Sequence, residues 1–483
     1  MSNKYYITTT LPYVNAEPHI GFALEIVQAD VLARYHRQNG DDVFFNTGTD
    51  EHGLKIYRKA QEEKKDAQKY CDEYAAKFDD LKIALNLSYN NFIRTTDEHH
   101  IKAAQEFWQR CDKNGDIYKK NYKVKYCVGC ELNKTDSELI DGKCEVHPEL
   151  ELEIIEEENY FFRYSNYQDK LLELYKNNLE FVVPDFRLKE IKNFTEQGLE
   201  DFSISRLKEK MPWGVPVPDD ENHVMYVWFD ALTNYISCLG WPEDEKKYKD
   251  FWPGVQVAGK DNLRQQSSMW QAMLLSAGLE PSKQILIHGF ITSAGQKMSK
   301  SSGNVIDPFE LVKKYGTDAL RYYLLAEITP FEDGDFTIEK FEQKYNADLA
   351  NGLGNLVARV SNLLEKNKIK LSLKRNTYYN TYLNTYQELA TQFDKKMQDY
   401  KFNEALEVLW KKLRECDEII TKQQPWKIEN ADEVKKVLEP VAQNILNVAE
   451  LLQPFLPDTA EKIIKLFTAD KIKKAEILFP RIN

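Results

Sequence analysis

Residues 5–10 read Tyr-Tyr-Ile-Thr-Thr-Thr and residues 42–45 read Asp-Val-Phe-Phe, with a helical pattern over 21–36 between them. The two outer runs are aromatic and β-branched, which favours strands. The middle run places its apolar residues on one helix face, and Asn39-Gly40 ends it: Phe22, Ile26, Ala29, Ala33. Strand, helix and strand at this spacing predict a βαβ unit and a parallel sheet.

A second strand–helix–strand pattern occupies 255–259, 261–278 and 284–287. The stretch from 118 to 215 differs, because it holds close cysteines, an acidic alternating run and an aromatic cluster. Beyond about 340, apolar residues recur in steps of three and four, which is typical of packed antiparallel helices. We therefore predict an α/β fold: a Rossmann-type parallel-sheet domain split by an insertion and followed by an α-helical bundle. The expected divisions are 1–117, 118–215, 216–340 and 341–483.

The length and composition are those of a globular protein with several domains. The 483 residues suggest about three domains at roughly 150 residues each. With 42% hydrophobic residues, 29% charged residues, 20 glycines, 17 prolines and 7 cysteines, collagen-like, disordered and disulfide-framework classes are excluded. No run approaches the ~18 apolar residues of a membrane helix, and the start is no signal peptide. We expect a cytoplasmic protein without a membrane segment. The net charge of -12 disfavours a general polyanion-binding surface but leaves room for a local basic face.

Three cysteines and a histidine have the spacing of a metal site. Cys127 and Cys130 are followed by Cys144 and His147, each pair separated by two residues. Such a Cys₃His set fills all four positions of a tetrahedral zinc ion, which is typical of a structural site. Free thiols, or a knuckle that has lost its metal, are the alternatives.

Two further motifs have the features of phosphate-binding sites. Pro18-His19-Ile20-Gly21 lies between the first strand and its helix, where free amides and the helix dipole attract anions. The run 297–304, with Lys297 and Lys300 among serines, makes a cationic loop that can close over a triphosphate. Each motif alone is weak, since a loop histidine or a basic loop is usually structural or solvated.

Together, His-Ile-Gly early and Lys-Met-Ser-Lys-Ser late resemble the signature pair of class I aminoacyl-tRNA synthetases. From Tyr6 to about Lys465 the chain resembles the methionyl-tRNA synthetases. The further matching runs are 10–13 (Thr-Leu-Pro-Tyr), 47–53 (Thr-Gly-Thr-Asp-Glu-His-Gly), 226–231 (Tyr-Val-Trp-Phe-Asp-Ala), 259–261 (Gly-Lys-Asp) and 288–290 (His-Gly-Phe).

The resemblance implies a two-step reaction in which ATP, with Mg²⁺, activates L-methionine and the adenylate is passed to tRNA(Met). It implies that His19 and Lys300 stabilise the triphosphate and that Lys297 supports the loop. Gly21 lets ATP approach the backbone, and Gly259 and Asp261 match residues at the ribose. Glu25 and Arg206 match polar residues of the same cleft. It also makes the zinc structural, holding the shape of the insertion.

For methionine, the resemblance implies that Asp50 holds the α-ammonium group. It gives a thioether pocket of mostly aromatic and apolar residues: Leu11, Tyr13, Trp228, Ala231, Leu232, Tyr235, Trp270. Four positions depart from the family pattern: Phe22 replaces a second signature histidine, Asn262 and Gln265 replace familiar residues, and Gln266 stands where a pocket histidine is expected.

The helical region resembles the family's anticodon-binding bundle, with Asn355, Arg359 and Trp426 at the positions of anticodon readers. The insertion is much shorter than the editing domains of the leucine, isoleucine and valine enzymes, which favours methionine. Because the sequence stops at Asn483, where some members add a dimerising domain, we expect a monomer. The alternatives are a paralogue that binds tRNA or methionine without charging, and a class I synthetase for another amino acid.

Overall fold

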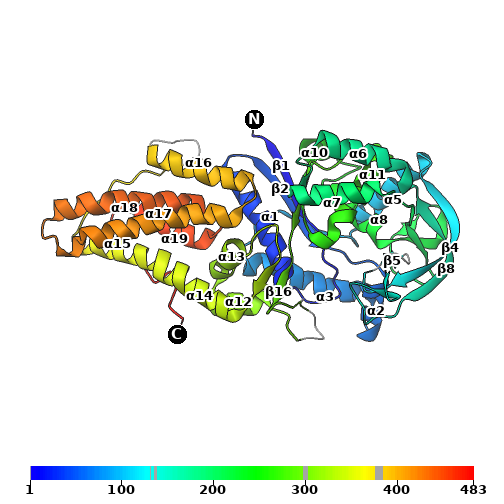
Figure 1. Cartoon of the computed structure of the whole chain (residues 1–483), viewed down its shortest axis with the longest axis horizontal. Helices are drawn as coiled ribbons and strands as arrows, with labels where there is room; N and C mark the ends of the chain where they lie inside the picture. Colours follow the sequence, from blue (N-terminus) through cyan, green and yellow to red (C-terminus); the bar gives the residue numbers. More distant parts are fainter. Residues whose placement is uncertain are drawn as a thin grey trace.

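The computed structural model describes residues 2–130, 132–134, 139–296, 298, 303–375 and 384–482. Lys297 and Lys300 lie outside these ranges, so their predicted roles stay predictions. The parallel sheet lies near the middle of the molecule, with a long helical bundle on one side and an antiparallel sheet on the other (Figure 1).

The central sheet has six strands in the order β3-β2-β1-β14-β15-β9, and every neighbouring pair is parallel. The order reverses between β1 and β14, which makes that crevice the switch point where doubly wound sheets bind ligands. The strands are β1 Lys4–Thr9, β2 Asp42–Thr49, β3 Asn91–Arg94, β9 Val182–Val183, β14 Val255–Gly259 and β15 Gln284–His288. The Rossmann-type parallel sheet predicted from the sequence is confirmed.

Alternate side chains of the sheet enter two separate cores. Ile7, Val257 and Leu286 join the core on the α1 face, whereas Tyr6 and Ala258 join the core on the other face. This is the period-two alternation expected of strands covered on both sides. The helices of this part are α1 Ile20–Gln38, α2 Leu54–Glu62, α3 Ala67–Asp79, α4 Leu81–Ala84, α5 Glu98–Lys113, α6 Gln168–Asn177, α7 Asp185–Glu196, α8 Val227–Ala231, α9 Asn234–Ser237, α10 Glu245–Phe251 and α11 Trp270–Ser276.

The region 118–215, together with residues 216–225 directly after it, builds two antiparallel sheets, and it also contributes one strand to the central sheet. A four-stranded sheet has the order β10-β8-β4-β5, and a three-stranded sheet the order β11-β13-β12. In contrast, β9 pairs in parallel with β15, so part of this region extends the central sheet. The strands are β4 Ile117–Cys127, β5 Leu132–Lys134, β6 Leu139–Ile140, β7 Lys143–Cys144, β8 Glu153–Phe162, β10 Phe202–Ser203, β11 Ser205–Leu207, β12 Pro216–Val217 and β13 Asp220–Met225.

After the central sheet the chain becomes helical, as predicted. A two-stranded parallel ribbon, β16 Ile291–Ser293 and β17 Gly334–Phe336, accompanies the first of these helices. The helices are α12 Pro308–Tyr315, α13 Thr317–Ala326, α14 Ile338–Lys344, α15 Asn355–Lys366, α16 Asn384–Gln398, α17 Phe402–Gln423, α18 Ala431–Leu452 and α19 Pro457–Phe467. Across the described ranges, none of the helices combines the length and apolar character needed to span a bilayer.

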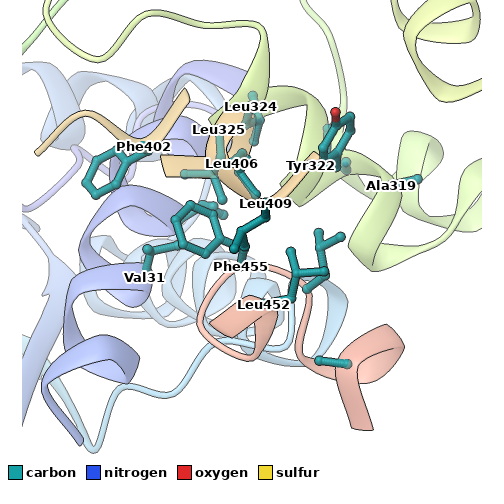
Figure 2. Packing of buried hydrophobic residues seen from close by; sticks show 14 of the residues in the cluster. Val31, Ala319, Tyr322, Leu324, Leu325, Phe402, Leu406, Leu409, Leu452 and Phe455 are labelled. Atoms are coloured by element: carbon teal, nitrogen blue, oxygen red, sulfur yellow. The ribbon is translucent and has the colours of Figure 1, made fainter. Parts of the chain in front are cut away.

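The bundle and the α1 face of the sheet share one core. Figure 2 shows Val31 of α1, Leu324 and Leu325 of α13, Leu406 of α17 and Phe455 within one group of buried apolar side chains. Because these residues pack as one cluster, the bundle is fixed to α1 rather than tethered by a linker.

Candidate active site and metal centre

A cavity of ≈ 560 Å³ opens at the carboxyl ends of the central strands. Thr10 and Leu11 follow β1, Asp50 follows β2 and Asp261 follows β14, and all four line it. Its place beside the β1–β14 crevice and its size fit a small-molecule site in a doubly wound sheet. The structure therefore brings together residues that are 251 positions apart in sequence, from Thr10 to Asp261 (261 − 10).

His19 caps the N-terminus of α1. Its Nδ1 accepts a hydrogen bond from the backbone N–H of Gly21 at 3.0 Å. Burial lowers the pKa of His19, so the ring is neutral at pH 7. With Nδ1 accepting, the ring proton must reside on Nε2, which is then a donor suited to an anionic oxygen. A Cβ on Gly21 would lie 2.8 Å from His19 Cε1, so glycine is needed for this close packing.

Glu25 and His288 form a buried pair between α1 and the end of β15. Glu25 Oε1 accepts from Thr10 N at 2.8 Å, and Glu25 Oε2 lies 2.9 Å from His288 Nε2. His288 Nδ1 donates to Gly289 O at 2.7 Å, so both ring nitrogens face acceptors. Burial lowers the pKa of His288, but the hydrogen bond and charge of Glu25 more than offset it and the pKa is raised. The pair joins β1, α1 and β15 on the α1 side of the cavity.

The segment that follows the lysine-rich loop returns to His19. Ile20 N donates to Ile306 O at 3.0 Å, which holds the chain just beyond the loop against the start of α1. The position of the replaced second histidine is filled by an apolar contact, since Phe22 packs edge-on against Phe78 with centroids 5.4 Å apart. The chain at Ile306 is therefore held next to the start of α1, whereas Lys297 and Lys300 lie outside the described residues.

Asp50 is held by backbone pairing with the loop after β1. Asp50 N donates to Pro12 O at 2.9 Å, and Val14 N donates to Asp50 O at 3.2 Å. The next residue, Glu51, is fixed by a two-pronged ion pair with Arg94, with contacts of 2.6 and 2.8 Å. Asp50 is thereby placed on the cavity wall, 2% exposed, where a carboxylate can meet an ammonium group.

The predicted thioether pocket is largely assembled. Leu11, Tyr13, Trp228, Ala231, Leu232, Tyr235 and Gln266 line the cavity. Trp270 does not line it: this residue is fully buried behind Tyr235, with ring centroids 5.9 Å apart. Arg206 is also set back, stacked on the ring of Tyr226 at 4.3 Å. Gln265 and Gln266 belong to a π-helical stretch, Gln265–Met269, a form frequent at functional sites.

A buried carboxylate lies between two histidines beneath this wall. Asp230 Oδ2 is 2.6 Å from His52 Nδ1, and Asp230 Oδ1 is 2.8 Å from His100 Nε2. His100 Nδ1 contacts Ser237 Oγ at 2.9 Å. This network ties α8, which carries Trp228 and Ala231, to the strand end that carries Asp50.

The four predicted zinc ligands converge. The ligand atoms of Cys127, Cys130, Cys144 and His147 all lie within 4.8 Å of one another, and Cys130 Sγ is 3.1 Å from His147 Nδ1. Three thiols and an imidazole at these separations suit tetrahedral zinc and leave no open position. A Cβ on Gly129 would lie 2.6 Å from His147 Cγ, so glycine lets the histidine ring approach.

The zinc knuckle, the segment that carries Cys127, Cys130, Cys144 and His147, also borders the cavity. Its predicted role was only to hold the shape of the insertion. Gly129, Cys130, Val146 and His147 are among the lining residues. Lys55 connects the knuckle with the cavity wall. Its Nζ donates to Gly129 O at 3.5 Å and lies 5.8 Å from the centre of the Tyr13 ring. Three cationic residues of the cavity lining were not predicted from the sequence: Lys55, Lys134 and Arg264. A lysine two positions after the Asp-Glu-His-Gly run was the available signal for Lys55.

The predicted anticodon readers meet at the other end of the bundle. Arg359 Nη1 contacts Asp417 Oδ1 at 2.5 Å, and the Arg359 guanidinium lies 5.7 Å from the Trp426 ring centre. Asn355 is one turn before Arg359 on α15. Trp426 is 47% exposed, so one arginine and one open aromatic face are presented together.

Known proteins match this architecture along the whole chain. The family model described as tRNA synthetases class I (M) matches residues 5–151 and 133–361, and that for the anticodon-binding domain of tRNA ligase matches 380–481. The methionine–tRNA ligase of Thermotoga maritima is 42% identical over 472 residues, covering 96% of this chain and 75% of that protein. That of Brucella suis is 41% identical over 486 residues, covering 98% and 94%.

Solved structures agree. Mycobacterium tuberculosis methionyl-tRNA synthetase in complex with methionyl-adenylate superposes with a TM-score of 0.89 at 35% identity, covering 100% of this chain and 99% of that one. Its apo form gives a TM-score of 0.83 at 33% identity, with the same coverage. Sequence, fold and cavity lead to one conclusion: the chain belongs to the methionyl-tRNA synthetase family of class I aminoacyl-tRNA synthetases.

Proposed function

We propose that this protein ligates L-methionine to tRNA(Met) in an ATP-dependent reaction through a methionyl-adenylate. The observation that carries the proposal is the ≈ 560 Å³ cavity at the switch point, with the Asp50 carboxylate on one wall and Trp228 and Tyr235 on another. A carboxylate beside an aromatic pocket suits an amino acid with a soft, unbranched side chain. The methionine–tRNA ligases that match the chain over nearly its full length support the same assignment.

In the first step, a methionine carboxylate oxygen attacks the α-phosphorus of ATP, and the bond to pyrophosphate breaks. The protein's task is positioning and charge stabilisation rather than covalent chemistry. His19 Nε2–H would donate to a phosphate oxygen at the N-terminus of α1, and Lys297 and Lys300 would neutralise the leaving pyrophosphate. Mg²⁺ would reach the site already bound to the ATP phosphates.

The remaining roles follow from position. Asp50 would hold the methionine ammonium group, while Gly259 and Asp261, at the end of β14, would receive the ribose of ATP. Gly21 would let the nucleotide approach the start of α1. Glu25 would act as an anchor, because its carboxylate already binds Thr10 and His288. The wall of the thioether pocket would be Leu11, Tyr13, Trp228, Ala231, Leu232, Tyr235 and Gln266, with Trp270 supporting Tyr235 from behind.

In the second step, a hydroxyl of the tRNA's terminal adenosine attacks the carbonyl carbon of the adenylate, and AMP leaves. We propose that residues 1–117 and 216–340 perform both steps, that 118–215 is the insertion and that 341–483 reads the anticodon. Asn355, Arg359 and Trp426 would bind splayed anticodon bases by edge hydrogen bonds and stacking. Zinc bound by Cys127, Cys130, Cys144 and His147 would cross-link the knuckle that borders the cavity.

The test is methionine- and ATP-dependent charging of a tRNA(Met) transcript. We expect charging by the wild-type protein and a severe loss in His19→Ala, because the triphosphate loses a donor. Adenylate formation without charging would remove the tRNA half of the proposal. Tight binding of tRNA or methionine without either reaction would instead support the non-charging paralogue.

A further inference from the structure

Arg321 is a fully buried arginine at the place where the bundle meets the central sheet. It lies on α13, and its side chain and that of its partner Asp30 on α1 are both 0% exposed. Apolar side chains surround the pair: Val31 follows Asp30, Leu324 and Leu325 lie about one helical turn after Arg321, and Phe455 belongs to the same cluster (Figure 2). A buried ion pair in such a core is weak evidence for stability, since an apolar pair of similar volume often stabilises as well.

The guanidinium binds acceptors from three separate segments. Nε donates to Phe455 O at 2.8 Å, and Nη2 donates to Pro454 O at 2.8 Å. Nη1 contacts Asp30 Oδ2 at 2.8 Å and donates to Leu85 O at 3.1 Å. A planar fork with fixed donor directions sets both distance and angle between these segments, which a lysine cannot do.

Asp30 is equally constrained on its own side. Its Oδ2 also accepts from Arg34 Nε at 2.7 Å, and its Oδ1 accepts from Ser88 N at 2.6 Å and Ser88 Oγ at 2.7 Å. Next to the pair, Asp318 Oδ2 accepts from Thr459 N at 2.6 Å. Within the described residues, α1, α13 and the α18–α19 turn are therefore interlocked by directional bonds as well as by packing.

The contacts of Arg321 form a joint between the bundle and the central sheet. This joint lies between the active site and the proposed anticodon-binding end, the two places that a bound tRNA must reach. α1 starts at Ile20, directly after His19 of the first signature motif, and carries Asp30 about three turns later. α17 starts near α1 at Phe402 and runs outward for 22 residues, about 33 Å, towards Trp426. α18 returns over the same length and ends just before Pro454 (Figure 1). The angle at Arg321 therefore decides where the anticodon end stands relative to the active site.

We infer that Arg321 is a positioning residue for tRNA charging: it fixes the anticodon-binding end at the distance and angle that deliver the 3′ end of the bound tRNA to the adenylate. The inference rests on the proposed function of the bundle. A rigid joint converts anticodon binding into a high effective concentration of the 3′ end at the site, and a displaced joint forfeits that gain without altering adenylation.

The experiment uses Arg321→Lys, which keeps the charge beside Asp30 but loses the fork. Three rates are measured on the full chain: ATP–pyrophosphate exchange, charging of tRNA(Met), and charging of the same tRNA with a changed anticodon. We expect exchange within about twofold of wild type, and about a tenfold or greater loss with tRNA(Met), since misplacements near 1 Å carry such costs. The rate of charging of the changed-anticodon tRNA should stay near its wild-type value. The ratio of the two charging rates, tRNA(Met) over changed-anticodon tRNA, should therefore fall by about tenfold or more.

A purely structural arginine would lower all three rates together and leave the ratio unchanged, which would overturn the inference. Arg110→Lys, at a half-exposed pair with Glu106, is the matched control and should keep every rate. If Arg321→Lys does not fold, the double variant Asp30→Asn/Arg321→Met replaces it, because it removes both buried charges. The same ratio of the two charging rates is measured and should fall in the same way. If wild-type protein charges both tRNAs equally, the proposed anticodon end itself is wrong and the inference falls with it.

Discussion

Among single residues, Asp50 is the carboxylate best placed to select an α-amino acid. Asp50→Asn keeps the shape of the side chain but removes the charge that would face the ammonium group. We expect the KM for methionine to rise by roughly 10- to 100-fold, the value of a hydrogen bond to a charged group, with the KM for ATP little changed. Pyrophosphate exchange measured against each substrate checks this. An equal rise for ATP would contradict the assigned role.

The Asp230 network predicts a pH dependence of stability. Burial raises the pKa of Asp230, but the charges and hydrogen bonds of His52 and His100 more than offset this and hold it at about 2, below the ordinary 3.8. A lowered carboxyl pKa stabilises the fold fully above 3.8, and this stabilisation is lost as the pH falls towards 2. Asp230→Asn should therefore reduce the free energy of unfolding by roughly 3 kcal/mol at pH 6.

That difference between Asp230→Asn and wild type should shrink as the pH falls from about 4 towards 2, because the carboxyl of the unfolded chain takes up a proton near 3.8 and that of the folded protein only near 2. Denaturant unfolding at a series of pH values measures it. Asp185→Asn, at an exposed pair with Lys189, is the control and should change little at any pH. A pH-independent difference would show that the charge of Asp230 is not what stabilises the network.

Candidate site residues could be predicted from the sequence where they belong to short recognisable motifs, and not where only the fold brings them to the cavity. Asp50 and Trp228 belong to recognisable runs and line the cavity, and His19, in the first signature run, caps the N-terminus of α1. Lys55 was missed although it stands two positions after the Asp-Glu-His-Gly run, because only the fold shows that it reaches Gly129 at the edge of the cavity. Arg264 was missed because nothing in its sequence neighbours marks it as a lining residue. Trp270 packs against Tyr235 and does not line the cavity, and residue type alone does not distinguish a pocket wall from the residue that supports it.

At the scale of elements, the knuckle depends on a glycine for steric reasons. Gly129→Ala would place a Cβ 2.6 Å from His147 Cγ, so the ring must move away from the three thiols. We expect weaker zinc binding, seen as faster loss of zinc to a chelator, together with a higher KM for methionine because the knuckle borders the cavity. Cys416→Ala, a buried thiol outside the knuckle, should keep its zinc. Unchanged zinc retention in Gly129→Ala would contradict the packing argument.

The long apolar strands were predictable and the short ones were not. The expected strand 255–259 coincides with β14, where Val255 and Val257 are the residues that favour a strand. β3 has only four residues, Asn91–Arg94, and just its two middle residues, Phe92 and Ile93, favour a strand. β9 has only two residues, and pairing with β15 rather than local propensity defines it.

At the scale of the whole molecule, tRNA selection and amino-acid activation should be separable. Trp426→Ala removes an exposed stacking surface, and base–aromatic stacking is worth about 1–3 kcal/mol. Charging of tRNA(Met) should fall by roughly 5- to 100-fold while pyrophosphate exchange holds. Phe186→Ala is the matched control, because Phe186 is 45% exposed and also lies near an arginine, Arg187. Equal losses from both variants would argue against a reader at Trp426.

The most direct test of the central claim is ATP–pyrophosphate exchange with the purified, zinc-loaded protein, given each of the twenty amino acids in turn. Exchange with methionine alone is predicted, and it would show that Phe22 packed on Phe78 replaces the second histidine without loss of adenylation. Exchange with a different amino acid would keep the class but refute the pocket built from Asp50, Trp228 and Tyr235. Absence of exchange with all twenty, from folded protein, would contradict the enzyme assignment itself.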